Sequence, residues 1–141
     1  IARNLLEMSL LRVPVIVTVI GEGGSGGALG IGIGDRIIML ENAWYSVIAP
    51  ESCATILMRS TDKKDKLSEE LKLTAPDLKK LGIVDTIINE PLGGAQNDPT
   101  KVASGLKSEI LKLLAELKRI PAERLVEERI RRFREIGRWT E

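Results

Sequence analysis

The stretch that decides the fold covers residues 15–27 and reads Val-Ile-Val-Thr-Val-Ile-Gly-Glu-Gly-Gly-Ser-Gly-Gly. Its first six residues are apolar or β-branched throughout, a pattern typical of a strand buried on both faces. Five of the next seven residues are glycines, which predicts a turn from this strand directly into a helix. Backbone N–H groups at such a turn lack helical partners and face the positive end of the helix dipole. We therefore predict that the bare backbone of residues 21–27 is the functional centre.

Several motifs with known mechanisms compete for this glycine-rich turn. Residues 21–26 match the dinucleotide fingerprint G-x-G-x-x-G, with Glu41 downstream as a candidate ribose ligand. Residues 23–27 match the nucleophile elbow G-x-S-x-G, but the usual base is histidine and the chain has none. A P-loop is excluded because no Lys-Ser or Lys-Thr follows the last glycine. A purely structural role in tight packing also stays open.

The high density of glycines in this turn favours its interpretation as an oxyanion hole. Two backbone N–H groups in such a site stabilise charge that develops on a carbonyl oxygen, and no titratable side chain is required. That requirement agrees with the absence of histidine. Ser25 is accordingly interpreted as a residue that forms the turn rather than as a nucleophile.

Outside this stretch the chain alternates segments of strand and helix character, which predicts the α/β class. The expected strands cover residues 36–40, 44–48 and 83–88, with a turn at 41–42. The expected helices cover residues 2–11, 28–34, 51–58, 68–73 and 74–82, followed by two helices within residues 101–141. Residues 59–68 are expected to form a charged surface loop that ends in a capping Ser68, and residues 89–99 a long loop.

Composition narrows the classes of function. The chain has 141 residues, 43% of them hydrophobic, and a net charge of +1, so neither nucleic acid nor a membrane surface is an expected partner. The longest apolar run, residues 13–20, is too short to span a bilayer. The single Cys53 cannot form an internal disulfide, which fits the reducing cytoplasm. Because the chain begins without methionine inside a predicted helix, we expect it to be the C-terminal piece of a longer protein.

Six motifs occur in the order found in one enzyme family. They occupy residues 13–15, 21–29, 45–51, 73–76, 83–85 and 90–95. Together they make the chain, up to its last helices, resemble the carboxyltransferase α subunit of bacterial acetyl-CoA carboxylase. The resemblance implies a crotonase-like (ClpP/crotonase) spiral of β-β-α units with C-terminal helices. It assigns residues 1–100 to the C-terminal part of the carboxyltransferase core and residues 101–141 to a helical extension used in assembly.

The resemblance also implies a reaction. Carboxyl passes from carboxybiotin, held on a separate biotin carboxyl carrier protein, to acetyl-CoA, which gives malonyl-CoA for fatty acid biosynthesis in the cytoplasm. Activity requires a β subunit in an α2β2 heterotetramer, and this chain holds no metal. Gly26 and Gly27 are implied as the oxyanion donors to the ureido oxygen of biotin, and Gly23, Gly24 and Ser25 as residues that contact the substrate.

The sequence differs from the residues usual in that family at three places. Ser52 replaces a usual glycine, Met58 a common tryptophan, and Gln96-Asn97 a usual His-Arg. The last change bears on any role of its loop in binding coenzyme A phosphates or in stabilising a dimer. Two alternatives stay open, the biotin-binding half of a propionyl-CoA or glutaconyl-CoA type carboxyltransferase and a non-catalytic assembly module.

Basic residues are concentrated on the last predicted helix. They alternate with glutamates, so we predict a solvated helix face or a subunit contact there. The residues concerned are Arg124, Arg129, Arg131, Arg132, Arg134 and Arg138.

Overall fold

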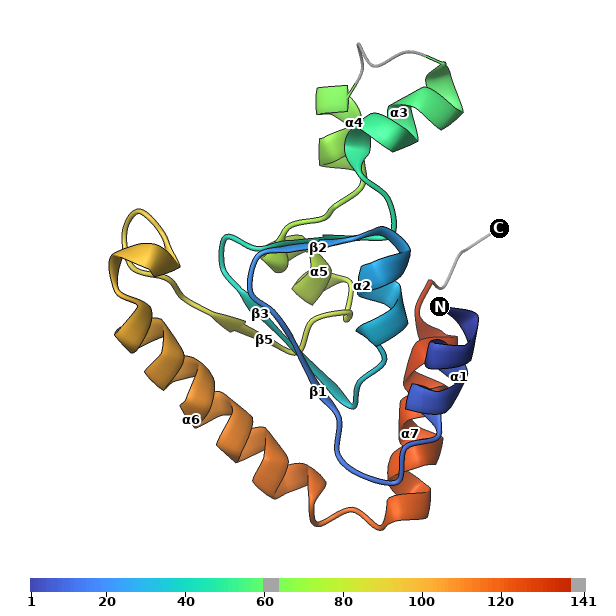
Figure 1. The fold of residues 1–141 in the computed structure, drawn as a ribbon, viewed down its shortest axis with the longest axis vertical. Helices are drawn as coiled ribbons and strands as arrows, with labels where there is room; N and C mark the ends of the chain where they lie inside the picture. The colour runs from blue at the N-terminus through green and yellow to red at the C-terminus, as the bar shows by residue number, and fades with distance from the viewer. Residues whose placement is uncertain (60–63, 138–141) are drawn as a thin grey trace.

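The structure is a computed structural model that describes residues 1–59 and 64–137 (Figure 1). Its strands form two parallel sheets between which the chain alternates. The first sheet, in the order β1-β3-β5, contains β1 (Ile16–Val19), β3 (Arg36–Leu40) and β5 (Thr86–Ile88). The second sheet pairs β2 (Glu22–Gly24) with β4 (Trp44–Ser46). Because β1 is followed by β2 and β3 by β4, each a strand of the other sheet, the chain winds as a spiral of β-β-α units.

Helices surround this spiral on several sides. The helical elements are α1 (Ala2–Ser9), α2 (Ser25–Ile31), α3 (Pro50–Met58), α4 (Lys64–Glu70), α5 (Ala75–Lys80), the 3-10 turn η1 (Ala95–Asn97), α6 (Pro99–Leu117) and α7 (Ala122–Glu135). The long helix α6 runs along one side of the first sheet, and α7 lies beside α1 (Figure 1). Helices α3 and α4 project together from the body of the molecule (Figure 1).

The centre of the core is β3 rather than the strand that the sequence favoured. Residues Ile37, Ile38, Met39 and Leu40 of β3 are all 3% exposed or less. In contrast, β1 forms one end of the three-stranded sheet, and only Val19 of its four residues is buried. The prediction that the run before the glycines is buried on both faces is therefore wrong within the described residues. The uninterrupted apolar pattern is shared by central and edge strands of a parallel sheet, so it cannot separate them.

Most predicted elements are confirmed, and three need correction. The helix predicted over residues 28–34 begins at Ser25 and ends at Ile31. The strand over residues 36–40 and the helix end before Gly82, which has a φ of +74°, are as predicted. The glycine stretch is not a simple turn, because residues 22–24 form β2 and pair with β4. The charged loop predicted over 59–68 is wrong from Lys64 onward, where α4 begins and includes Ser68; residues 60–63 lie outside the described residues.

A buried ion pair joins the last helix to the start of the first sheet. Arg129 of α7 donates from Nε and Nη2 to the two carboxylate oxygens of Asp35 at 2.9 and 2.8 Å, and the two side chains are 0% and 3% exposed. Arg129 also donates to the carbonyl oxygens of Met8, Leu11 and Val13, at 3.0, 2.8 and 2.9 Å. Asp35 in turn accepts a bond of 2.7 Å from the N–H of Val15. One guanidinium therefore fixes α7, the segment after α1 and the entry to β1 and β3.

Arg132, one helical turn further on, repeats the arrangement at the next strand. Its Nη1 donates to both carboxylate oxygens of Asp85 at 2.9 and 2.8 Å, and its Nη2 donates to the carbonyl of Ile83 at 2.9 Å. Asp85 also accepts a bond of 2.6 Å from the N–H of Ile37. The prediction of a solvated face or a subunit contact is therefore wrong for Arg129 and Arg132. Their spacing of three residues places both on the helix side that faces the two carboxylates.

Replacing Arg129 with leucine is expected to destabilise the fold strongly, because Asp35 would stay buried without its cation. Removing one partner of a buried pair typically costs about 3–5 kcal/mol. Thermal and urea unfolding of the full-length protein measure the effect. Arg134→Leu, a change on the exposed side of α7, is the matched control and should leave stability nearly unchanged. Equal stability of the two variants would contradict this account.

Candidate functional site

The glycine stretch forms an uncapped helix start. Gly24 ends β2 in an extended conformation and is the N-cap of α2, and no side-chain hydrogen bond caps this end. Ser25 follows with a φ of +58°, in the left-handed region that a residue other than glycine rarely adopts. Because the first N–H groups of a helix have no partner within it, those of Ser25, Gly26 and Gly27 are available to an external acceptor.

Gly26 and Gly27 differ in how open they are. Gly27 is exposed, and a Cβ built on it would meet nothing within 4 Å. A Cβ on Gly26 would lie 2.6 Å from Cδ1 of Ile1, the far end of a flexible side chain. The structure therefore brings the two predicted oxyanion donors together in successive positions of the first turn of α2. Their role as donors stays a prediction.

Gly23 and Gly24 have a visible packing role next to these donors. A Cβ on Gly23 would lie 2.7 Å from Cδ2 of Tyr45, and one on Gly24 would lie 3.1 Å from the ring of Trp44. The absence of side chains thus lets two aromatic rings of β4 lie directly against the β2 backbone. The substrate contacts predicted for Gly23, Gly24 and Ser25 stay predictions.

Tyr45 connects the second sheet to α2, a link that the sequence did not reveal. Its hydroxyl donates to the carbonyl of Ala28 at 3.4 Å, and its N–H donates to the carbonyl of Leu73 at 3.0 Å. Burial raises the pKa of the Tyr45 phenol above its ordinary value, so the hydroxyl keeps its proton at neutral pH. Tyr45 therefore holds α2 against β4 and indirectly fixes the direction of the N–H groups at the helix start.

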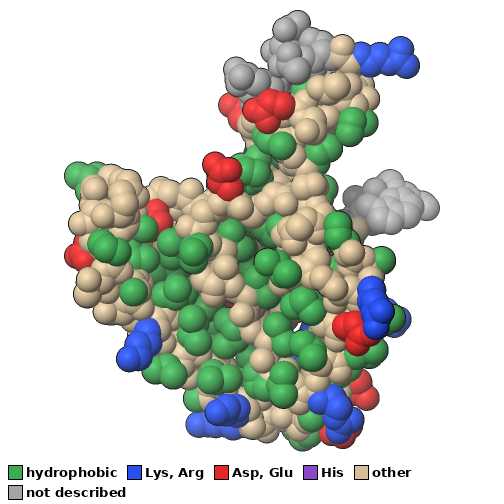
Figure 2. All heavy atoms as spheres, viewed as in Figure 1, with side chains coloured by type: hydrophobic (Ala, Val, Ile, Leu, Met, Phe, Trp, Pro, Cys, Tyr) green, Lys and Arg blue, Asp and Glu red, His purple; other side chains and the backbone are tan. Residues whose placement is uncertain are grey.

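A small apolar pocket adjoins the glycine stretch. Its volume is about 280 Å³, and its walls include Val17, Val19, Ala28, Ile31 and Tyr45. Figure 2 shows hydrophobic side chains gathered over the face of the molecule on which β1 and α2 lie. The site thus combines backbone donors with an adjacent apolar wall, which suits a ligand that presents a carbonyl-type oxygen on an apolar frame.

The competing motif interpretations do not agree with this geometry. A dinucleotide fingerprint requires a strand that leads through a tight turn into a helix, but β2 intervenes here. Glu41 accepts a bond of 3.0 Å from the N–H of Glu90 and so connects the carboxyl ends of β3 and β5. No hydrogen bond links the Ser25 hydroxyl to a base within residues 1–59 and 64–137, as a nucleophile elbow would require.

The loop with the unusual Gln96-Asn97 pair is braced by those two side chains. Gln96 donates to the carbonyl of Gly93 at 2.6 Å, and Asn97 donates to the carbonyl of Leu92 at 2.8 Å. Gly93 and Gly94 have φ values of +86° and +102°, which only glycine adopts without strain. The substituted pair therefore closes this glycine turn locally.

Residues 1–59 and 64–137 contain neither a membrane-spanning helix nor a cluster of metal-ligating side chains. Among them, no helix combines the length and apolar character that a membrane crossing needs. They also contain no group of three or more His, Cys, Asp or Glu side chains placed to hold a metal ion. Cys53 is buried, at 7% exposure.

The fold and the site define a class of spiral α/β proteins. In this class a short helix follows the second strand of a β-β-α unit, and the first backbone N–H groups of that helix are free to act as donors. Comparison with known families identifies the group within that class. Residues 1–137 match the family described as acetyl co-enzyme A carboxylase carboxyltransferase-like, and the chain belongs to this family.

Curated relatives agree with the family assignment. The chain is 55% identical over 141 residues to the acetyl-coenzyme A carboxylase carboxyl transferase subunit alpha of Chlorobium luteolum, covering all of this chain and 42% of the relative. It is 52% identical to the protein of the same name from Thermus thermophilus, covering all of this chain and 45% of the relative. The chain thus spans less than half the length of the relatives that it matches.

Solved structures establish the fold independently. A chain of a Pseudomonas malonate decarboxylase hetero-tetramer in complex with coenzyme A superposes with a TM-score of 0.64 at 18% identity, covering 92% of this chain and 51% of that chain. A chain of transcarboxylase 12S superposes with a TM-score of 0.54 at 22% identity, covering 78% and 22% of the two chains. The predicted fold class, an α/β crotonase-like spiral with C-terminal helices, is confirmed.

Two single alanine substitutions should distinguish a glycine that packs against a neighbouring side chain from a glycine with free space beside it. Gly23→Ala forces a methyl group against the Tyr45 ring, and overpacking of this kind typically costs about 1–3 kcal/mol. Gly27→Ala meets no atom and should keep or slightly raise stability, since alanine favours a helix over glycine by about 0.5–1 kcal/mol. Thermal unfolding of both variants of the full-length protein tests the pair. A Gly27→Ala variant as unstable as Gly23→Ala would refute the open geometry.

Proposed function

We propose that this chain is the C-terminal part of the carboxyltransferase α subunit of an acetyl-CoA carboxylase. In this proposal the whole protein transfers carboxyl from carboxybiotin to acetyl-CoA and so forms malonyl-CoA. The proposal is supported by family membership and by the names of relatives that are 52–57% identical over essentially the whole chain. The single observation that carries it is the uncapped start of α2, with Ser25 left-handed and Gly27 open.

The chemistry fits what this site offers. Bound carboxybiotin would supply the activated carboxyl group, and the methyl carbon of acetyl-CoA would accept it and lose a proton. The described residues fit such a ligand, because the first turn of α2 presents N–H donors and the pocket of about 280 Å³ beside it is apolar. Gly26 and Gly27 would donate to the ureido oxygen, where negative charge develops when the carboxyl group leaves. Gly23, Gly24 and Ser25 would contact the same ligand from the strand side.

Assembly belongs to the same proposal. We infer a β subunit as partner, because the relatives are named as the alpha subunit of a carboxylase. Large apolar side chains remain uncovered on α3, where Ile56 and Leu57 are each 69% exposed, and this supports a protein partner. An α2β2 heterotetramer, a biotin carboxyl carrier protein and a cytoplasmic location complete the proposal. The helical extension over residues 101–141 would assist assembly in addition to its contacts within the chain.

Gly27→Pro should abolish most of the carboxyl transfer without unfolding the protein. Proline removes the N–H donor, yet it is tolerated sterically in the first turn of a helix. Removing one oxyanion donor typically lowers the rate by about 100- to 1000-fold. Malonyl-CoA formation would be measured with the full-length protein in complex with its β subunit.

Gly27→Ala is the matched control, because it changes the same position and keeps the N–H group. It should retain most of the rate, since a Cβ there meets no atom. If Gly27→Pro transfers carboxyl as fast as Gly27→Ala, Gly27 is not an oxyanion donor. If neither the variants nor the unmodified complex forms malonyl-CoA, the proposed reaction itself is wrong.

A further inference from the structure

Gly32, the C-cap residue of α2, is a glycine for a reason that its own backbone does not supply. Its φ of −84° and ψ of −4° are ordinary helical values that any residue adopts. A Cβ built on Gly32 would, however, lie 2.2 Å from the hydroxyl oxygen of Tyr45 and 2.8 Å from the carbonyl oxygen of Ala28. The space that a side chain needs is therefore taken by these two atoms.

Tyr45 lies between two glycines that both lack the side chain it would collide with. Its hydroxyl lies against Gly32, and its ring atom Cδ2 is 2.7 Å from the position of a Cβ on Gly23. The same hydroxyl donates to the carbonyl of Ala28 at 3.4 Å. Gly23, Ala28 and Tyr45 all line the apolar pocket of about 280 Å³. One side chain therefore contacts the strand and the helix that form two sides of this pocket.

Helix α2 depends on its neighbours for a fixed position. Three of its seven residues are glycines, the residue that weakens a helix interior most after proline. A helix of two turns is also too short to be stable alone, so its stability comes from tertiary packing. Within the described part of the chain, the Tyr45 hydroxyl makes the one hydrogen bond that joins a side chain to α2.

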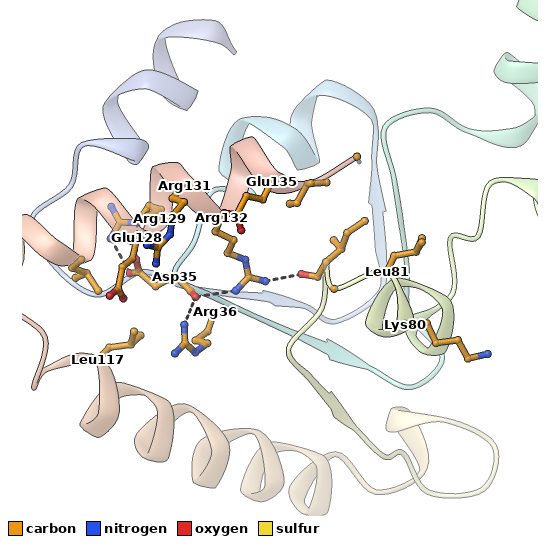
Figure 3. Close-up of a pocket in the computed structure, with 15 residues that line it drawn as sticks. Asp35, Arg36, Lys80, Leu81, Leu117, Glu128, Arg129, Arg131, Arg132 and Glu135 are labelled. Atoms are coloured by element: carbon orange, nitrogen blue, oxygen red, sulfur yellow. Dashed lines mark hydrogen bonds and ion pairs between the residues drawn. The ribbon is translucent and has the colours of Figure 1, made fainter. Parts of the chain in front are cut away.

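Ion pairs act elsewhere in the molecule. Figure 3 shows two arginines of α7, Arg129 and Arg132, beside Asp35 at the start of β3. Residues 20–34 contain a single charged side chain, Glu22, and no ion pair in the described part of the chain involves it. The helix that carries the candidate donors is therefore held by packing and not by charge.

We propose that Gly32 and Tyr45 are positioning residues of the carboxyl-transfer site. The inference rests on the proposed function, because it concerns Gly26 and Gly27 as oxyanion donors. A methyl group on Gly32 would enter between the Tyr45 hydroxyl and the Ala28 carbonyl and push α2 away from β4. The donors at the other end of this two-turn helix move with it.

This displacement should change the rate of the chemical step more than substrate binding. The donors act on negative charge that develops only as the carboxyl group leaves, so they stabilise the transition state and not the bound substrate. A misplaced donor therefore lowers kcat and leaves KM nearly unchanged. A residue that only stabilises the fold would lower the unfolding temperature and leave kcat of the folded enzyme as it is.

The test compares Gly32→Ala with Gly30→Ala in the full-length protein in complex with its β subunit. Carboxylated biotin carrier protein and acetyl-CoA are the substrates. We expect Gly32→Ala to lower kcat for malonyl-CoA formation by about tenfold to 100-fold, since a misplacement of 1 Å can cost this much. The KM for acetyl-CoA should change by no more than about twofold.

Gly30→Ala is the matched control, because it adds the same methyl group to α2 away from Tyr45. A Cβ on Gly30 would meet two atoms of Ile1 at 3.7 and 3.9 Å, which is ordinary van der Waals contact. This variant should keep kcat within about twofold of the unmodified complex. Circular dichroism and thermal unfolding verify that each variant is folded.

A rescue variant separates positioning from a general loss of packing. Tyr45→Phe alone removes one neutral hydrogen bond and should lower kcat by less than about tenfold. It also removes the oxygen that a methyl group on Gly32 meets first, and the next atom of Tyr45, Cζ, lies at 3.4 Å. Gly32→Ala combined with Tyr45→Phe should therefore be at least about threefold faster than Gly32→Ala alone, the non-additivity expected of residues in contact.

The outcomes distinguish this inference from the proposed function. The inference is overturned if folded Gly32→Ala has the kcat of Gly30→Ala, or if the double variant is no faster than Gly32→Ala. If Gly32→Ala does not fold, a folded and active double variant supports the inference, and a double variant that is equally unfolded overturns it. If the unmodified complex forms no malonyl-CoA, the proposed function itself fails, and the positioning role fails with it.

Discussion

The buried pair between Arg129 and Asp35 is the interaction on which the remaining arrangement depends. Its two charges are almost completely removed from water, which is favourable only because nearly every polar atom finds a partner. The guanidinium saturates carbonyls that a loop between helix and strand would otherwise leave unpaired. The carboxylate satisfies the N–H of Val15 at the start of β1. Three segments distant in sequence, residues 8–15, the start of β3 and α7, therefore meet at one charge pair.

This constraint is transmitted to the glycine site through the strands. Once the amino ends of β1 and β3 are fixed, their parallel register, with Ile16 opposite Arg36, determines where both strands finish. The chain then crosses to the second sheet, and β2 takes its position from β4. Tyr45 completes the link by touching both Gly23 and the carbonyl of Ala28. The orientation of the N–H donors is thus a property of the whole spiral and not of the glycines alone.

The sequence predicted which segments form strands and helices better than it predicted where those segments lie in the fold. Strand and helix patterns identified most segments, and the strand over residues 36–40 was bounded correctly because residues 37–40 are all apolar and lie between clear breaks. The pairing of β2 with β4 could not be predicted, since Glu-Gly-Gly has almost no strand propensity and depends on a distant partner. Arg129 was missed for a related reason. An arginine among glutamates on an amphipathic helix resembles a solvated face until the opposing Asp35 is known.

The two ends of the first sheet have different roles, one in stability and the other in the candidate site. At the amino ends, Arg129 and Asp35 form a buried pair and Arg132 and Asp85 a partly buried one, and these two pairs hold the strands in place. At the carboxyl end of β1, the candidate donors are the backbone N–H groups of a glycine-rich helix start. A site whose donors are peptide N–H groups cannot change protonation, and its strength comes from fixed orientation. Ion pairs at the far end of the same strands are therefore the kind of support that such a site requires, because they fix the backbone from a distance.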